Sequence, residues 1–273
     1  MKSRNPLARR QNIRDALNRN GALSVEELCR LVDASPATLR RDLSYLDEEG
    51  SIERSRGGAA PRRQHPAEAA IALREKHYAA EKAAIAEAAL QFIRPGDTVF
   101  LNDGSTTLAL ARLLVRSGME LFVATSGINV AIALSEGERL QVCVLGGMMR
   151  AMTLATDGAF ALKTLECLNA DVAFVSCDSF GAVQGLNFLY PGDATIAAAM
   201  LARARRKVAL IVSAKTEWKA RLKSTDIETL DVVVTDRATP RLSADCDAAG
   251  VSLVAADMPA EGVLPPARGR GRR

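Results

Sequence analysis

Short apolar runs alternate with helical segments through the larger part of this chain, and this alternation constrains the fold more than any other feature. The apolar runs typical of strands are 98–101, 121–125, 141–145, 171–176, 208–212, 232–235 and 251–254. The helical segments are 67–92, 108–116, 128–134, 160–168 and 194–205. Because the runs are apolar throughout, both faces of each strand must be buried. The sequence therefore predicts an α/β domain with a mostly parallel sheet covered by helices on both faces.

A segment of different charge precedes this α/β region. Residues 1–63 contain 13 Lys and Arg against 9 Asp and Glu, whereas residues 64–267 have a net charge of −4. A basic segment joined to an acidic one indicates that only the basic segment meets a polyanion. We expect a small basic domain, a linker, a larger domain and a disordered basic tail, at residues 1–60, 61–73, 74–256 and 257–273.

The composition argues against several classes of protein. No run of about 18 apolar residues occurs, so no membrane span is expected. The polar N-terminus lacks the apolar segment of a secretory signal. The five cysteines are scattered, and none has the spacing of a metal finger. We expect reduced thiols in a cytoplasmic protein without metal or cofactor, with His65 and His77 as surface or hinge residues.

Residues 35–50 read as one helix with both ends marked. Ser35 can cap the first amides, Pro36 suits the first helical position, and Gly50 can end the helix. One apolar stripe at i, i+4 and i+7 consists of Leu39, Leu43 and Leu46. The opposite face, whose arginine, hydroxyl and aromatic side chains fit the major groove of DNA, holds Ala37, Thr38, Arg40, Arg41, Ser44 and Tyr45. An ordinary amphipathic surface helix is the alternative.

The residues before this helix complete a helix-turn-helix pattern. Residues 6–18 place apolar side chains at roughly helical spacing, and Ser24 with Glu27 has the signature of a capping box. The short helix that follows is expected to bury Val25, Leu28 and Leu31. A turn at residues 33–34 then leads into the longer basic helix, which is the order of this motif.

Residues 51–58, Ser-Ile-Glu-Arg-Ser-Arg-Gly-Gly, fit a two-stranded wing. Ile52 would turn inward while Arg54 and Arg56 stay exposed, and the two glycines permit a tight reversal. Arginines placed there can bind phosphate, which supplies affinity without sequence choice and weakens as salt rises.

These motifs, which span residues 23–59, resemble the amino-terminal domain of the DeoR family of bacterial transcriptional regulators. The family pattern Ser-x-x-Thr-aliphatic-Arg-Arg-Asp-Leu is met by Ser35, Thr38, Leu39, Arg40, Arg41, Asp42 and Leu43. The resemblance implies a winged helix-turn-helix with this helix in the major groove. The DNA-contacting residues that we expect are Ser35, Thr38, Arg40, Arg41, Tyr45, Arg54 and Arg56. The open alternative is that one arginine of the adjacent pair bonds a carboxylate nearby: Asp42, Asp47 or Glu48.

The loop after residues 98–101 is a candidate anion site, since ligands of parallel sheets bind at the carboxyl ends of strands. Gly104 allows close backbone approach, and the helix that follows offers free amides and the positive end of its dipole. With the neighbouring hydroxyls, these features suit a phosphate. The candidate residues are Asp103, Gly104, Ser105, Thr106 and Thr107. The alternative is an ordinary strand-to-helix turn with a Ser/Thr cap.

Three other strand ends are expected to converge on this loop. Thr125 and Ser126 place small polar side chains before a helix, while Asp178 and Lys215 follow two further strands. An aspartate and a lysine beside a phosphate cradle suit the hydroxyls and the anionic end of a sugar phosphate. Lys215 is equally well read as a surface lysine, and Asp178 as a cap or turn residue.

Residues 74–236 also resemble the DeoR-family effector domain, through residues 93–107, the Leu-Gly-Gly turn at 145–147 and Ser-Ala-Lys at 213–215. That domain is similar to ribose-5-phosphate isomerase and glucosamine-6-phosphate deaminase. In the isomerase the Gly-Ser-Thr loop holds phosphate and a Gly-Ala-Asp-like turn carries a catalytic aspartate. The resemblance therefore implies a sensor of a phosphorylated sugar or related metabolite.

This sequence departs from the family pattern near the implied pocket. Residues 176–179, Ser-Cys-Asp-Ser, replace the usual Gly-x-Asp-Gly turn. Phe188 and Tyr190 would bring bulk close to the ligand. These changes leave the identity of the effector open and do not touch the DNA-binding interpretation.

We expect a transcriptional repressor that binds a double-stranded DNA operator as a homo-oligomer and responds to a phosphorylated small molecule. The rival is a sugar-phosphate isomerase or deaminase with an appended helical domain. Its strand ends offer Asp103, Asp178 and Asp193, but no histidine or glutamate at a matching loop. A third hypothesis is a regulator whose larger domain only oligomerises.

Overall fold

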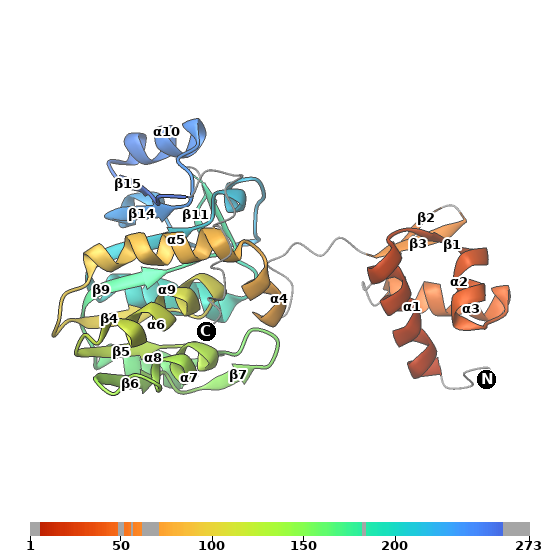
Figure 1. Ribbon diagram of the computed structural model, residues 1–273, viewed down its shortest axis with the longest axis horizontal. Helices are drawn as coiled ribbons and strands as arrows, with labels where there is room; N and C mark the ends of the chain where they lie inside the picture. Colours follow the sequence, from red (N-terminus) through yellow and green to blue (C-terminus); the bar gives the residue numbers. More distant parts are fainter. Residues whose placement is uncertain (1–5, 49–51, 56, 62–70, 182–183, 259–273) are drawn as a thin grey trace, which may run out of the picture. The chain divides into compact units, whose positions relative to one another are not determined.

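The computed structural model describes residues 6–48, 52–55, 57–61, 71–181 and 184–258. The chain divides into two compact units, Met1–His65 and Pro66–Arg273 (Figure 1). Most of the expected linker (62–70) and of the expected tail (259–273) lies outside the described residues. None of the described helices is both long enough and apolar enough to cross a membrane.

The smaller unit is a winged helix-turn-helix. Its elements are α1 (Pro6–Asn20), β1 (Leu23–Ser24), α2 (Val25–Val32), α3 (Pro36–Glu48), β2 (Ile52–Ser55) and β3 (Gly58–Pro61). The expected capping box opens α2: the Ser24 side chain accepts from the Glu27 amide, and the Glu27 carboxylate accepts from the Ser24 amide. Asp33 ends α2 in the left-handed conformation (φ 47°), which starts the tight turn into α3. The expected end of α3 at Gly50 lies outside the described residues.

One apolar core joins the three helices to the wing. The leucine stripe of α3 lies inside it as expected, with Leu39, Leu43 and Leu46 at most 1% exposed. The expected burial of Leu31 is wrong, because this side chain is 58% exposed. The inward row of α2 runs through Leu28 and Val32, and Leu31 lies about 60° around the helix from Leu28.

The wing has one strand more than expected. β2 and β3 pair antiparallel, and β1 pairs with the other edge of β3, which gives the order β1-β3-β2. Gly58 is required at this contact, since a Cβ there would lie 2.3 Å from the Leu23 carbonyl oxygen. The extra strand fixes the wing to the turn between α1 and α2.

The larger unit contains the expected parallel sheet. Its seven strands are β4 (Thr98–Leu101), β5 (Leu121–Thr125), β6 (Leu140–Val144), β9 (Ala170–Val175), β12 (Ala204–Ile211), β14 (Val232–Thr235) and β15 (Ser252–Ala255). Their order is β15-β14-β12-β9-β4-β5-β6, and every neighbouring pair is parallel. The α/β class predicted from uninterrupted apolar runs is confirmed.

Helices cover both faces of the sheet (Figure 1). One face packs against α5 (Ala79–Ala89), α6 (Ser105–Ser117) and α7 (Ile128–Leu134). The other packs against α8 (Ala159–Glu166), α9 (Pro191–Ala202) and α10 (Pro240–Ala249). Strand β4 shows the division, since Val99 and Leu101 enter one core and Phe100 enters the other.

Several short elements were not predicted. They are a hairpin of β7 (Met148–Arg150) and β8 (Ala155–Asp157), a small sheet of β10 (Ser179–Gly181), β11 (Gly185–Phe188) and β13 (Leu222–Thr225), and the 3-10 turns η3 (Ser213–Thr216) and η4 (Ile227–Thr229). The helix expected at 67–92 is instead α4 (Ile71–Lys76), α5 and η2 (Leu90–Phe92), and its first residues, 67–70, lie outside the described residues. Tyr78 breaks it with a left-handed backbone (φ 56°). Leu73, expected on its apolar side, is 55% exposed.

The strand order reverses between β4 and β9. From β4 the chain builds outward through β5 to β6, then returns and builds outward from β9 through β12. At such a reversal the loops after the two central strands diverge and leave a crevice at their carboxyl ends. The loops after β4 and β9 therefore frame the natural ligand position of this sheet.

Candidate DNA-binding surface and effector cluster

The outer face of α3 begins at a capped helix start. The Ser35 hydroxyl accepts from the Thr38 amide at 3.3 Å and lies 2.9 Å from the Thr38 hydroxyl. Arg40 and Arg41 are exposed, and neither forms an ion pair within the part of the chain that the structure describes. Four of the seven expected DNA-contacting residues thus lie together on one accessible face.

The acid within the Arg-Arg-Asp motif is held by the first helix. Asp42 is 2% exposed and accepts from Arg9 Nε at 2.5 Å and from Arg10 Nε at 3.0 Å. Asp42 is therefore not the partner of Arg40 or Arg41, so the alternative is wrong for this carboxylate, while the Glu48 side chain lies outside the described residues. The two bonds anchor α3 to α1 and leave the adjacent arginines available.

Tyr45 and the wing extend the same face. The Arg10 guanidinium lies 3.6 Å from the centre of the Tyr45 ring, which is 46% exposed. Arg54 on β2 donates to the Ser44 hydroxyl of α3 at 3.0 Å, so the wing and the helix are tied at this point. Arg56 lies outside the described residues.

At the carboxyl edge of the large sheet, the loops after β4, β5 and β9 are bonded together. Asn102 donates its side-chain amide to the Ser176 carbonyl at 2.8 Å and accepts from the Ser176 amide at 3.0 Å. The Asp103 amide donates to the Ser126 hydroxyl at 3.1 Å. Asn102 thus links the loops after β4 and β9, where the strand order reverses. The surrounding sequence did not indicate this role.

The expected phosphate loop is buried and tightly folded. Gly104 has φ 138°, a conformation that favours glycine, and α6 begins at the next residue. Ser105, Thr106 and Thr107 are at most 7% exposed, and the Thr107 hydroxyl donates to the Gly104 carbonyl at 3.0 Å. The Thr125 hydroxyl accepts from the Gly127 amide at 3.0 Å.

Lys215 reaches this loop through Ser176, whose hydroxyl lies 3.5 Å from that of Thr106, while Asp178 lies two residues further on. The Lys215 ammonium donates to the Ser176 hydroxyl at 2.8 Å. Asp178 accepts from Arg74 Nη2 at 3.3 Å and from the Leu189 amide at 2.9 Å. Lys215 is thus not a solvated surface lysine, and Asp178 joins α4 to the segment after β11.

Three charged residues that the sequence analysis did not assign to this site complete it. Arg74 comes from α4, Lys82 from α5 and Arg150 from β7. Lys82 is 5% exposed, and its ammonium donates to the carbonyl oxygens of Arg74 and His77 at the break between the helices. A lysine on the inward side of an alanine-rich helix, beside Ile85 and Ala86, was the signal that would have identified it.

Arg150 binds two carboxylates and an aromatic ring. Its guanidinium donates to both oxygens of Asp193, at 2.9 and 3.0 Å, and to Asp157 Oδ2 at 2.6 Å. The same group lies 4.0 Å from the centre of the Tyr190 ring. Tyr190 therefore lies beside Arg150, whereas Phe188 is 3% exposed and packs within the core.

We call the seven charged residues at this edge the effector cluster: Arg74, Lys82, Asp103, Arg150, Asp178, Asp193 and Lys215. Burial, reinforced by the Asp193 carboxylate, raises the pKa of Asp103 to about 8. Burial lowers the pKa of Lys82 to about 7, with Lys215 and Arg74 adding to the shift. Four basic side chains thus face three carboxyls of the cluster and Asp157, which Arg150 also binds; near neutral pH Lys82 is only partly charged and Asp103 is mostly neutral. This balance suits an anion.

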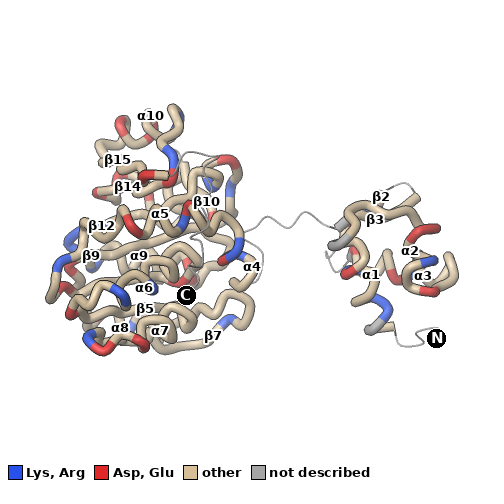
Figure 2. The backbone as a smooth tube through the Cα atoms, viewed as in Figure 1, with Lys and Arg blue, Asp and Glu red and all other residues tan. Residues whose placement is uncertain are grey.

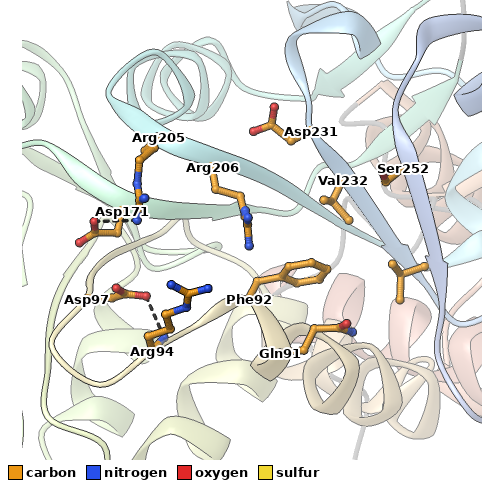
Figure 3. A pocket seen from close by; sticks show the side chains of 11 residues that line it. Gln91, Phe92, Arg94, Asp97, Asp171, Arg205, Arg206, Asp231, Val232 and Ser252 are labelled. Carbon is orange, nitrogen blue, oxygen red and sulfur yellow. Dashed lines mark hydrogen bonds and ion pairs between the residues drawn. The ribbon is translucent and has the colours of Figure 1, made fainter.

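A separate cavity of about 630 Å³ opens at the opposite, amino edge of the sheet. Figure 3 shows Arg94 and Arg206 reaching into it beside Phe92. Asp171, on its wall, is bound by Arg205 at 3.2 Å, and charges of both signs gather beside β9 and β12 (Figure 2). None of the residues expected to bind the effector lines this cavity.

Comparison with known proteins covers both units. The sequence profile of the DeoR-like helix-turn-helix domain matches residues 9–64, and that of the DeoR C terminal sensor domain matches residues 77–237. The chain is 30% identical to the HTH-type transcriptional regulator GolR of Listeria innocua, over 85% of this chain and 91% of that protein. It is 27% identical to the HTH-type transcriptional repressor GlcR of Bacillus subtilis, over 90% and 95%.

Among solved structures, the chain is similar to ribose 5 phosphate isomerase A from Neisseria gonorrhoeae. The identity is 15%, the TM-score is 0.38, and the match covers 52% of this chain and 54% of that chain. A likeness of this size does not indicate function.

Proposed function

Because this chain belongs to the DeoR family of transcriptional regulators, we propose that it represses a sugar or carbohydrate operon and is released from its operator by a phosphorylated metabolite. The observation that carries the proposal is the outer face of α3, where Arg40 and Arg41 stand exposed and unpaired among the described residues. Membership of this family supports DNA as the binding partner, and we expect the protein to act in the cytoplasm, where that DNA lies.

The effector cluster supports the choice of ligand. A phosphate would find a helix start at Ser105, the buried ammonium group of Lys82, the half-buried ammonium group of Lys215, and a neutral carboxyl at Asp103. The carboxylates of Asp178 and Asp193 can accept hydrogen bonds from the hydroxyl groups of a sugar. The cluster therefore suits a small molecule with an anionic end and a polyol body.

Linkage between the two sites explains control. The effector is bound more tightly by an arrangement of two chains in which the DNA-binding units do not match the spacing of the operator half-sites. Effector binding then lowers the affinity for DNA by the same factor by which DNA binding lowers the affinity for the effector. Two or more chains are needed, because one small head buries little surface on DNA.

The test of DNA recognition is binding of the full chain to its own promoter region. Arg41→Ala should weaken binding about 5- to 150-fold, the value of one arginine contact to a base or phosphate. Arg116→Ala, an exposed arginine of the larger unit, is the matched control and should leave affinity unchanged. Equal affinity of Arg41→Ala and the wild type would contradict the role of α3.

The test of sensing is a thermal titration with inorganic phosphate, ribose 5-phosphate and glucosamine 6-phosphate. A ligand that binds only the folded chain must raise the unfolding midpoint. A shift with a sugar phosphate that is lost in Lys215→Met supports the proposal. No shift with any phosphosugar would favour a larger domain that only oligomerises.

The enzyme alternative draws on one observation, the protonated Asp103 beside other carboxylates. Such a group can act as a general acid at neutral pH. Turnover of ribose 5-phosphate or glucosamine 6-phosphate that disappears in Asp178→Asn would establish that alternative. We expect no turnover.

A further inference from the structure

In the larger unit, Leu73 (55% exposed) and Tyr78 (44%) lie on or next to α4, whereas six other exposed large apolar side chains come from α7, β6, β7, the turn after β7 and α8. They are Ile132 (63% exposed), Val144 (43%), Met148 (79%), Met149 (51%), Met152 (48%) and Phe160 (78%). We call these six residues the apolar face. Isolated apolar side chains are normal on a protein surface, whereas a group of this kind marks an interaction site.

The segments that carry the apolar face are neighbours in space. Met148 pairs with Asp157, two residues before α8, and Phe160 Cβ would lie 3.9 Å from a Cβ built on Gly146. The Ile128 amide at the start of α7 donates to the Leu154 carbonyl of the hairpin at 2.8 Å. Figure 1 shows α7, α8 and the β7 hairpin beside the β6 edge of the sheet.

The β6 edge is itself unprotected. Among the described strands β6 pairs only with β5, and its sequence Leu-Gln-Val-Cys-Val contains no charge and no proline. An edge strand without these features pairs with other strands unless something covers it. The apolar face and the unpaired edge of β6 together form a surface whose exposure to water is unfavourable.

We propose that a second copy of this chain covers the apolar face. An edge strand and the side chains around it are self-complementary across a two-fold axis, which makes an isologous contact possible. The rim carries both signs, in the exposed pairs Lys163–Glu166 and Arg139–Glu120, and so does not suit an anionic membrane. The tail, residues 259–273, offers only Val263 and Leu264 as large aliphatic side chains and cannot cover the face.

The proposed interface is continuous with the effector cluster. Strand β7 exposes Met148 and Met149, while Arg150, the next residue, binds Asp193 of the cluster and the neighbouring Asp157. A ligand that changes the hydrogen bonds of Arg150 therefore shifts β7, the strand against which the second copy packs. This coupling depends on the proposed effector function, whereas the interface itself does not.

The test is the mass of the full chain in solution, measured by sedimentation over a range of concentrations. The wild type should be a dimer or a larger assembly of even number at micromolar concentration. Met148→Glu combined with Phe160→Glu should raise the dissociation constant about 100-fold or more, because two central apolar contacts are replaced by like charges. Met258→Glu, at a methionine outside this face that is 37% exposed, is the control and should keep the wild-type mass.

Circular dichroism and the unfolding midpoint distinguish lost association from lost folding. A double variant that remains folded and becomes monomeric supports the interface. A wild type that is monomeric throughout, or a folded double variant of unchanged mass, overturns it. DNA binding and phosphosugar shifts in a folded double variant of unchanged mass would leave the proposed function standing while this interface fails.

Discussion

Replacing Arg150 with methionine tests the charge balance of the effector cluster directly. The guanidinium makes three hydrogen bonds of 2.6 to 3.0 Å to Asp193 and Asp157, whose side chains are 6% and 25% exposed. Removing one partner of a buried pair costs about 3–5 kcal/mol, whereas an exposed pair contributes about 0–1 kcal/mol. Since one carboxylate is buried and the other is partly exposed, we expect the free energy of unfolding to fall by about 2–4 kcal/mol.

The pH dependence of this loss identifies its cause. Burial already raises the pKa of Asp193, and Arg150 opposes that shift. Without Arg150 the folded-state pKa rises further, so the folded protein binds more protons than the unfolded chain over a wider range, and stability falls as pH rises through that range. The loss should therefore be larger at about pH 8 than at about pH 5.

The full chain is unfolded with urea and by heating, and the transition of the larger unit is measured. For a domain of this size, a loss of 2–4 kcal/mol corresponds to a midpoint lower by roughly 4–16 °C. Arg139→Met is the matched control, since its pair with Glu120 is 64% and 71% exposed and should contribute no more than about 0.5 kcal/mol. Equal losses in the two variants, or a loss in Arg150→Met that ignores pH, would refute the reasoning.

Three further outcomes are expected. Leu43→Ala should destabilise the smaller unit by about 2–5 kcal/mol and thereby reduce DNA binding. Leu73→Ala, at an exposed position, should change neither quantity. The measurement is the unfolding of the smaller unit, monitored by circular dichroism. Ser35→Ala should cost about 1 kcal/mol in the same transition through loss of the cap on α3, and an unchanged midpoint would show that the cap contributes little. Binding of a sugar phosphate, measured by calorimetry, should weaken as pH rises through about 7, where Lys82 loses its proton, and this dependence should disappear in Lys82→Met.

The sequence by itself determined the fold class and the recognition helix, because both depend on local periodicity. Short apolar runs that alternate with helical segments predicted strands of a parallel sheet, and the sheet has seven strands, of which the edge strands β6 and β15 are only partly buried. The spacing of Leu39, Leu43 and Leu46 fixed which side of α3 turns inward, and so which side carries the arginines. The strand ends that carry Asp103, Asp178 and Lys215 followed from the direction of the strands alone.

Only the tertiary structure decided which distant side chains complete each site. Asp42 is held by arginines more than 30 positions earlier in the chain, and Asp178 is held by Arg74, 104 positions away. Arg150 lies on a hairpin whose strands, of three residues each, are too short to give a strand signal, so its pairing with Asp193 could not be predicted. Periodicity reports how one element meets its core, whereas partners across the fold depend on strand order and on where the loops converge.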